Sequence, residues 1–266
     1  MLTQAVDFRA EADTLHALLR DLPDADWNHA TTFKSWTIND VVQHLHWGDL
    51  MAAASVAGPE YFAHFRSEGK ALRDQGMNGV EATRARLGDL TGGRLRARWY
   101  GTMVDLCTKL TAMAPDTRLK WAGPDMGVKM FTTARQMETW AHGQEVYDLL
   151  GVTREPTLRL RNIAEIGVRT YGWTFVNRGL ALPGPAPSVR LAGPDGAVWQ
   201  WHDQNDENCV TGNAVEFCQV VTQVRNIADT SLAVTGAAAT EWMRIAQCFA
   251  GPPETPPAPG TRAPQK

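Results

Sequence analysis

Apolar residues in the first half of the chain recur at the three- and four-residue intervals that are typical of amphipathic helices. Residues 4–22 carry one such stripe and residues 95–113 carry another, and a proline follows each of them. Between the two, a helix is expected to begin after Thr37, which can cap it together with Asp40 at the third helical position. Weaker periodicity predicts two shorter helices, over 60–68 and 78–90.

A fourth long helix is predicted over residues 134–148, where polar side chains interrupt an apolar face. At about 100° per residue, Phe131, Glu138, His142 and Leu149 fall nearly on one line. Burying a charged or polar group is costly unless it is paired or bound to a metal. Because Glu138 and His142 are four residues apart, both side chains can reach one ion.

The pattern changes after Gly151, where strands join the helices. A Pro-Asp-Gly turn separates two alternating runs and predicts a hairpin. The elements predicted here are a helix over 157–178, strands over 188–193, 197–202 and 231–235, and helices over 213–225 and 238–249. We therefore predict a four-helix bundle followed by a smaller α+β domain. The predicted boundaries are 1–152 for the bundle, 153–250 for the second domain and 251–266 for a disordered, proline-rich tail.

Composition and charge narrow the possible functions. The 266 residues carry a formal net charge of -3 and no basic cluster, which argues against a nucleic-acid partner. No apolar run reaches membrane-spanning length, and the N-terminus lacks the pattern of a signal peptide. The four cysteines are scattered without a CxxC motif, so we expect reduced thiols and a cytoplasmic protein.

His44 lies on the apolar face of the second predicted helix and is a third candidate ligand beside Glu138 and His142. Three protein ligands with an open position are typical of catalytic zinc, and two histidines with one carboxylate also suit ferrous iron. The structural alternative is a buried, hydrogen-bonded His–Glu pair that joins two helices. Because the ExxxH spacing is short and matches by chance, spacing alone leaves the two interpretations about even.

Two segments, SWTINDVVQHLHWGD and ARQMETWAHGQEVYDLLG, resemble the DinB-like metal-binding superfamily. They are most similar to its branch of mycothiol-dependent maleylpyruvate isomerases and mycothiol S-transferases of actinobacteria. The matching positions are Trp36, Thr37, His44 and Leu45, followed by Glu138 and His142. The resemblance implies that His44, Glu138 and His142 hold a divalent metal. Zinc is the expected ion, and iron or nickel is the alternative. The chain departs from the pattern at Glu145, where aspartate is expected, and at Val224, where a basic residue is usual.

The resemblance also implies the chemistry. A metal-bound small thiol, mycothiol by resemblance, would ionise and add to an electrophilic small molecule. Loss of the thiol after bond rotation would give cis–trans isomerisation, and retention would give S-transfer. Metal-assisted hydrolysis is the rival enzyme reaction, and a metal-binding module without turnover is the alternative outside catalysis. A fourth protein ligand would favour a structural metal.

Two arginines are candidate catalytic cations. Arg135 lies one turn before Glu138, where it can pair with Glu138 or Asp49, or bind a substrate carboxylate. Pairing is the favoured interpretation, because a buried arginine is usually matched by an acid. Arg225 is the best basic candidate from the second domain to face the site, and a surface salt bridge is its structural alternative. Trp140 and Tyr147 on the back of the site helix predict that the second domain covers that helix.

Overall fold

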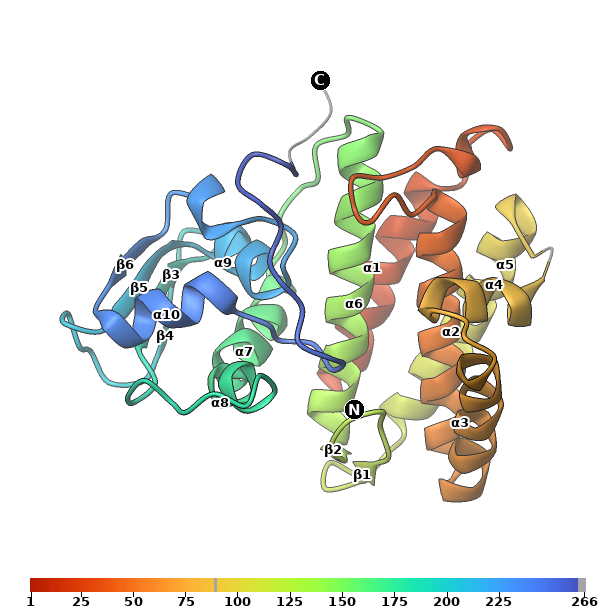
Figure 1. The fold of residues 1–266 in the computed structure, drawn as a ribbon, viewed down its shortest axis with the longest axis horizontal. Coiled ribbons are helices and arrows are strands. Elements are labelled where there is room, and N and C mark those ends of the chain that lie inside the picture. Colours follow the sequence, from red (N-terminus) through yellow and green to blue (C-terminus); the bar gives the residue numbers. More distant parts are fainter. Residues whose placement is uncertain (89, 263–266) are drawn as a thin grey trace. The chain divides into compact units, whose positions relative to one another are not determined.

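The computed structural model describes residues 1–88 and 90–262. The chain divides into two compact units, the first spanning Met1–Leu149 and the second beginning at Leu150 (Figure 1). Helices dominate the first unit, and a small sheet with helices forms the second. The predicted fold class, a helical bundle followed by a smaller α+β domain, is confirmed. Across the described ranges, no helix combines the length and the apolar character that crossing a membrane requires.

Four long helices make the bundle of the first unit. Their bounds are Thr3–Leu18 for α1, Ile38–Ala57 for α2, Gly92–Thr111 for α5 and Val128–Leu149 for α6. Helix α1 packs against α5 and α6, and α2 packs against the same two helices. The apolar stripes read from the sequence are buried in this core, as at Phe8, Leu15, Leu95 and Trp99. The four stripes therefore form one core.

Further elements complete the first unit. Helices α3, Pro59–Asp74, and α4, Gly79–Leu87, lie where two short helices were predicted, although α3, with 16 residues, is longer than predicted. A 3-10 turn, η1, spans Asp26–Asn28. The segment before α6 contains a two-stranded hairpin of β1, Arg118–Leu119, and β2, Met126–Gly127, around a turn rich in glycine and proline.

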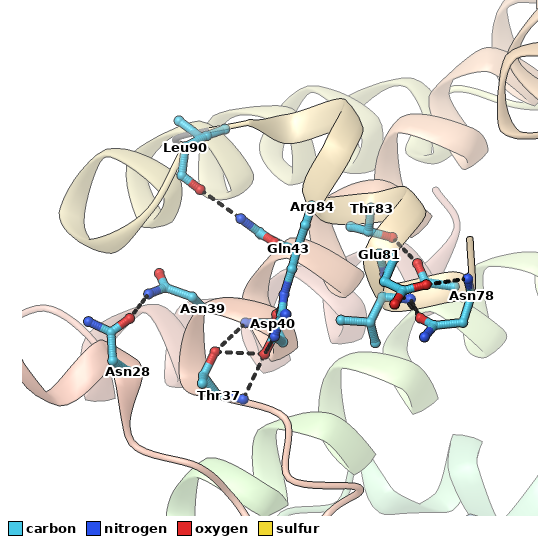
Figure 2. A network of polar contacts seen from close by, with 12 residues as sticks. Asn28, Thr37, Asn39, Asp40, Gln43, Asn78, Glu81, Thr83, Arg84 and Leu90 are labelled. Atoms are coloured by element: carbon cyan, nitrogen blue, oxygen red, sulfur yellow. Dashed lines mark hydrogen bonds and ion pairs between the residues drawn. The ribbon is translucent and has the colours of Figure 1, made fainter. Parts of the chain in front are cut away.

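The predicted cap of α2 is present and is joined to α4. Thr37 Oγ1 accepts a hydrogen bond from the Asp40 backbone N–H, and Asp40 Oδ2 accepts one from the Thr37 backbone N–H. Arg84 of α4 donates two bonds of 2.6 Å to the two carboxylate oxygens of Asp40 (Figure 2). This bidentate pair fastens α4 to the start of α2.

The Asp40–Arg84 pair predicts a defined pH dependence of stability. Burial alone would raise the pKa of the Asp40 carboxyl, but hydrogen bonds from Arg84 and Thr37 bring it below its ordinary value. The stabilisation is therefore present above the pKa of the unfolded chain and is lost as pH falls through the folded pKa. Because Arg84 is 55% exposed, Arg84→Met should cost only about 1 kcal/mol at pH 7 and pH 5. This cost should shrink below about pH 4 in urea unfolding. A cost that stays constant down to pH 3 would show that the pair contributes nothing through charge.

The second unit is a mixed sheet with helices. Its strands are β3 (Ser188–Ala192), β4 (Val198–Trp201), β5 (Cys209–Asn213) and β6 (Ala233–Thr235), in the order β4-β3-β5-β6. The predicted hairpin is confirmed as the antiparallel pair of β3 and β4. Strand β5 pairs parallel to β3 and was missed, because its short Cys-Val-Thr-Gly-Asn sequence lacks a clear alternation.

The helices of this unit are α7 (Leu160–Arg169), α8 (Tyr171–Val176), α9 (Ala214–Val221) and α10 (Ala237–Ile245). The single helix predicted over 157–178 is wrong, because the chain breaks at Thr170 into α7 and α8. A short 3-10 helix, η2, spans Ile227–Asp229.

The proline-rich tail was expected to be disordered, but residues 251–262 have defined hydrogen bonds. Gln223 donates to the Glu254 carbonyl, Asn226 donates to the Pro257 carbonyl, and Arg262 donates to the Gln223 carbonyl. Side chains elsewhere in the second unit thus satisfy carbonyls of this segment, and Arg262 in turn satisfies a carbonyl outside it. Composition did not reveal these partners. Residues 263–266 of the expected tail lie outside the described residues.

Candidate metal centre

Two helices bring the three candidate ligands together. His44 lies on α2, while Glu138 and His142 lie one turn apart on α6. The Nε2 atoms of His44 and His142 lie 3.3 and 3.4 Å from the same oxygen, Glu138 Oε2. All three ligand atoms lie within 4.8 Å of one another. The side chains therefore converge closely enough to hold one ion.

The cluster is accessible and has only three members. The side chains of His44, Glu138 and His142 are 36%, 20% and 14% exposed. Among the residues that the structure describes, no fourth histidine, cysteine, aspartate or glutamate joins them. Three protein ligands with access from outside are the arrangement of sites that exchange a ligand, whereas structural zinc is usually closed by four.

The protonation states of two members suit a metal. Burial and the nearby His44 lower the pKa of the His142 imidazole to about 4, although Glu138 opposes the shift. Burial alone would raise the pKa of the Glu138 carboxyl, but hydrogen bonds with His142 and His44 hold it well below its ordinary value. A neutral imidazole and an ionised carboxylate are the forms that donate electron pairs to a metal. The donor set therefore fits a divalent ion such as zinc or ferrous iron.

Two aromatic rings from the loop before α2 hold the imidazoles in place. Trp36 stacks on His142, with ring centroids 5.6 Å apart and planes 10° apart, and it also contacts His44. Phe33 meets His142 edge-on at 5.2 Å. Both rings flank a tight turn in which Lys34 and Ser35 have φ of 51° and 55°. Consecutive left-handed residues without glycine are uncommon, so this conformation was not readable from sequence.

The helices that carry the ligands are joined by a buried ion pair. Arg135 Nε donates to Asp49 Oδ1 at 3.0 Å, and Trp99 Nε1 donates to the other oxygen at 3.1 Å. A Cβ at Gly48 would lie 2.7 Å from the Arg135 guanidinium, so glycine there makes room for the Arg135 side chain. Pairing with Asp49, one of the two partners predicted for Arg135, is present. The Arg135 side chain is 2% exposed and is engaged by Asp49, which supports the pairing interpretation. The catalytic alternative for Arg135 stays a prediction.

A shallow recess opens beside His44, between α2 and α4. Its walls include Gln43 and His44 of α2 and Val80 and Thr83 of α4. Gln43 was not among the residues predicted from sequence to belong to the site. The only indication in the sequence is that Gln43 directly precedes the candidate ligand His44.

Other predicted positions have mixed outcomes. His46 points away from His44 on α2, which favours an exposed or loop-facing position. It is only 2% exposed, because α2 is packed by α3, α4, α5 and α6. Asp40 caps α2, as predicted, and it also binds Arg84. Cys218 is fully buried, which is typical of a packed thiol. Arg225 follows α9 in the second unit, where Nη1 donates to the Val224 carbonyl. Its role at the site stays a prediction, as does the covering of Trp140 and Tyr147.

Three comparisons place the chain among known proteins. A family model described as the mycothiol maleylpyruvate isomerase N-terminal domain matches residues 8–147. Two uncharacterized proteins from two strains of Mycobacterium tuberculosis are each 38% identical over 247 residues, covering 93% of this chain and 95% of theirs. Crystal structures of a mycothiol-dependent maleylpyruvate isomerase and of its single-residue mutant match with TM-scores of 0.52 and 0.51. In both comparisons the sequence identity is 14%, and the matched region covers 82% of this chain and 87% of the crystallised chain. The likeness shows a shared fold.

Proposed function

The chain belongs to the mycothiol maleylpyruvate isomerase N-terminal domain family, and from this membership we propose that it is a metal-dependent enzyme that uses a small thiol, mycothiol. The thiol adds to an electrophilic small molecule. Loss of the thiol after bond rotation completes a cis–trans isomerisation of the maleylpyruvate type, and S-transfer is the outcome when the adduct persists. The observation that carries the proposal is the accessible convergence of His44, Glu138 and His142.

The chain's own residues have distinct tasks in this reaction. His44, Glu138 and His142 would hold the ion, and zinc is the ion we propose. A divalent ion there favours the thiolate form of a thiol. Trp36 and Phe33 fix the plane of the His142 ring. The Asp49–Arg135 pair sets the separation of α2 and α6, and therefore of the ligands.

The nucleophile has to come from outside the chain. All four cysteines are buried, at Cys107, Cys209, Cys218 and Cys248. Burial raises the pKa of the Cys107 thiol to about 12 and that of the Cys218 thiol well above its ordinary value. Buried thiols with raised pKa values are poor nucleophiles, which supports an external thiol.

Metal analysis of protein purified without a chelating tag, followed by calorimetric titration with mycothiol, tests this function. We expect one divalent ion per chain and thiol binding that is lost when the metal is removed. Full metal content without thiol binding would contradict the thiol reaction and favour metal-assisted hydrolysis, in which the ion lowers the pKa of water. If the purified protein contains no metal and takes up none when metal is added, both the thiol reaction and metal-assisted hydrolysis are contradicted.

The second unit is proposed to supply a cation through Arg225, which would stabilise negative charge that develops after thiolate addition. Arg225→Ala should lower turnover by about 100-fold and leave metal content unchanged. Arg225→Lys should recover only part of the loss, because the planar guanidinium is gone. Melting temperatures of both variants control for the burial of this residue, which is 7% exposed. Unchanged turnover in Arg225→Ala would remove Arg225 from the mechanism.

A further inference from the structure

We propose that the recess between α2 and α4 is a subsite for the thiol, in which Gln43 Oε1 accepts a hydrogen bond from a hydroxyl or amide N–H of that molecule. This inference rests on the proposed function, since it assigns where the thiol's polar part binds. The recess adjoins His44, so a molecule whose sulfur reaches the candidate metal centre can place a polar group there.

Gln43 is the residue that points to a ligand. It is 3% exposed, and its Nε2 donates to the Leu90 carbonyl at 3.1 Å (Figure 2). Because a carbonyl requires a donor, this bond fixes which end of the amide is oxygen. The remaining atom, Oε1, is buried and has no hydrogen-bond partner. An unsatisfied buried acceptor is costly, so a donor supplied by a ligand would be favourable.

The lining of the recess selects for hydrogen-bond donors without negative charge. No lysine or arginine is among the lining residues, so a carboxylate or phosphate has no cation to meet there. Thr83 Oγ1 already donates its proton to the Gly79 carbonyl, which leaves its oxygen as an acceptor. Asp40 adds a carboxylate, which Arg84 and Thr37 engage. A neutral hydroxyl or amide N–H therefore suits the recess better than an anionic electrophile does.

The α4 wall of the recess is held in place from both ends. Asn78 and Glu81 form a capping box at its start, and Arg84 binds Asp40 one turn later (Figure 2). Gly79 also lines the recess, and a Cβ there would meet no atom within 4 Å. The α4 wall is therefore preformed, and a ligand reaches the buried Gln43 Oε1 when the Gln43 side chain shifts towards the recess. A larger residue at Gly79 can narrow the recess without a clash in the free protein.

Titration calorimetry of the metal-loaded protein with two thiols tests the subsite. Mycothiol offers polar groups to the recess, whereas propane-1-thiol offers only its sulfur and an alkyl chain. Gln43→Met should weaken mycothiol binding by about tenfold, the worth of one hydrogen bond, and leave propane-1-thiol binding within about twofold. Gly79→Leu, on the opposite wall, should also weaken mycothiol binding and leave propane-1-thiol binding nearly unchanged. The matched control is Gly93→Leu, at another helix start where a Cβ meets no atom within 4 Å.

The outcomes separate this inference from the function on which it rests. Unchanged mycothiol affinity in Gln43→Met and Gly79→Leu would overturn the subsite. Equal losses for both thiols, or reduced metal content in both variants, would overturn it as well, because the recess would then only support His44. Wild-type protein that holds metal but binds neither thiol would overturn the proposed function, and the subsite with it.

Discussion

Replacing Glu138 by alanine is expected to reduce bound metal to near background and to abolish turnover. Its Oε2 atom lies within 3.4 Å of both imidazoles, so it is the centre of the ligand set. His44→Ala and His142→Ala should have the same effect, because two remaining ligands hold a divalent ion weakly. We expect metal affinity to fall by more than about 100-fold, the upper end of losses for residues that merely support a ligand.

Elemental analysis of each purified variant measures this effect. Glu60→Ala is a matched control, because it removes an exposed glutamate from the first turn of α3, away from the three ligands. Each variant should remain folded, since an apolar side chain replaces a polar one at a partly exposed position. Full metal content in all three variants would show that the cluster is only a hydrogen-bonded junction of α2 and α6.

Breaking the buried ion pair between Asp49 and Arg135 should destabilise the protein far more than removal of Arg84 does. Arg135→Met leaves Asp49 fully buried with no opposite charge, and burial already raises the pKa of the Asp49 carboxyl. Removing one partner of a buried pair typically destabilises a protein by about 3–5 kcal/mol. We expect a loss of that size in urea unfolding at pH 7. Metal affinity should fall as well, because the pair joins the two helices that carry the ligands.

A double variant distinguishes charge burial from loss of packing. Asp49→Leu combined with Arg135→Met removes both charges and should recover most of the lost stability. If the double variant is instead as unstable as the sum of the single variants, the cost comes from packing and not from the unpaired carboxylate. A loss below about 1 kcal/mol in Arg135→Met would contradict the importance of the pair altogether.

The parts of the site that depend on helical geometry could be predicted from sequence. Glu138 and His142 are four residues apart on one helix, so their side chains had to lie together wherever that helix packed. The start of α2 was readable as well, because Thr37 and Asp40 satisfy each other locally. Bringing His44 to the same place depends on how α2 packs on α6. The apolar face of α2 made His44 a candidate, and the resemblance then implied that it joins Glu138 and His142.

The missed features depend on contacts between distant segments. Trp36 meets His142 only because a turn with two left-handed residues folds back on α6, and neither Lys34 nor Ser35 signals that conformation. His46 is buried because α2 is enclosed on several sides, and helical spacing on α2 alone does not reveal those neighbours. Gln43 is notable only because its amide oxygen is left without a partner, which no sequence pattern records.

The cobalt-substituted protein provides the most direct test of the central claim, that His44, Glu138 and His142 hold a metal that binds a small thiol. Addition of mycothiol should produce a thiolate-to-cobalt charge-transfer band that saturates at one thiol per chain. The same titration on Glu138→Ala should produce no band, because that variant lacks the metal. A wild-type protein with one cobalt per chain and an unchanged spectrum at saturating mycothiol would contradict the claim.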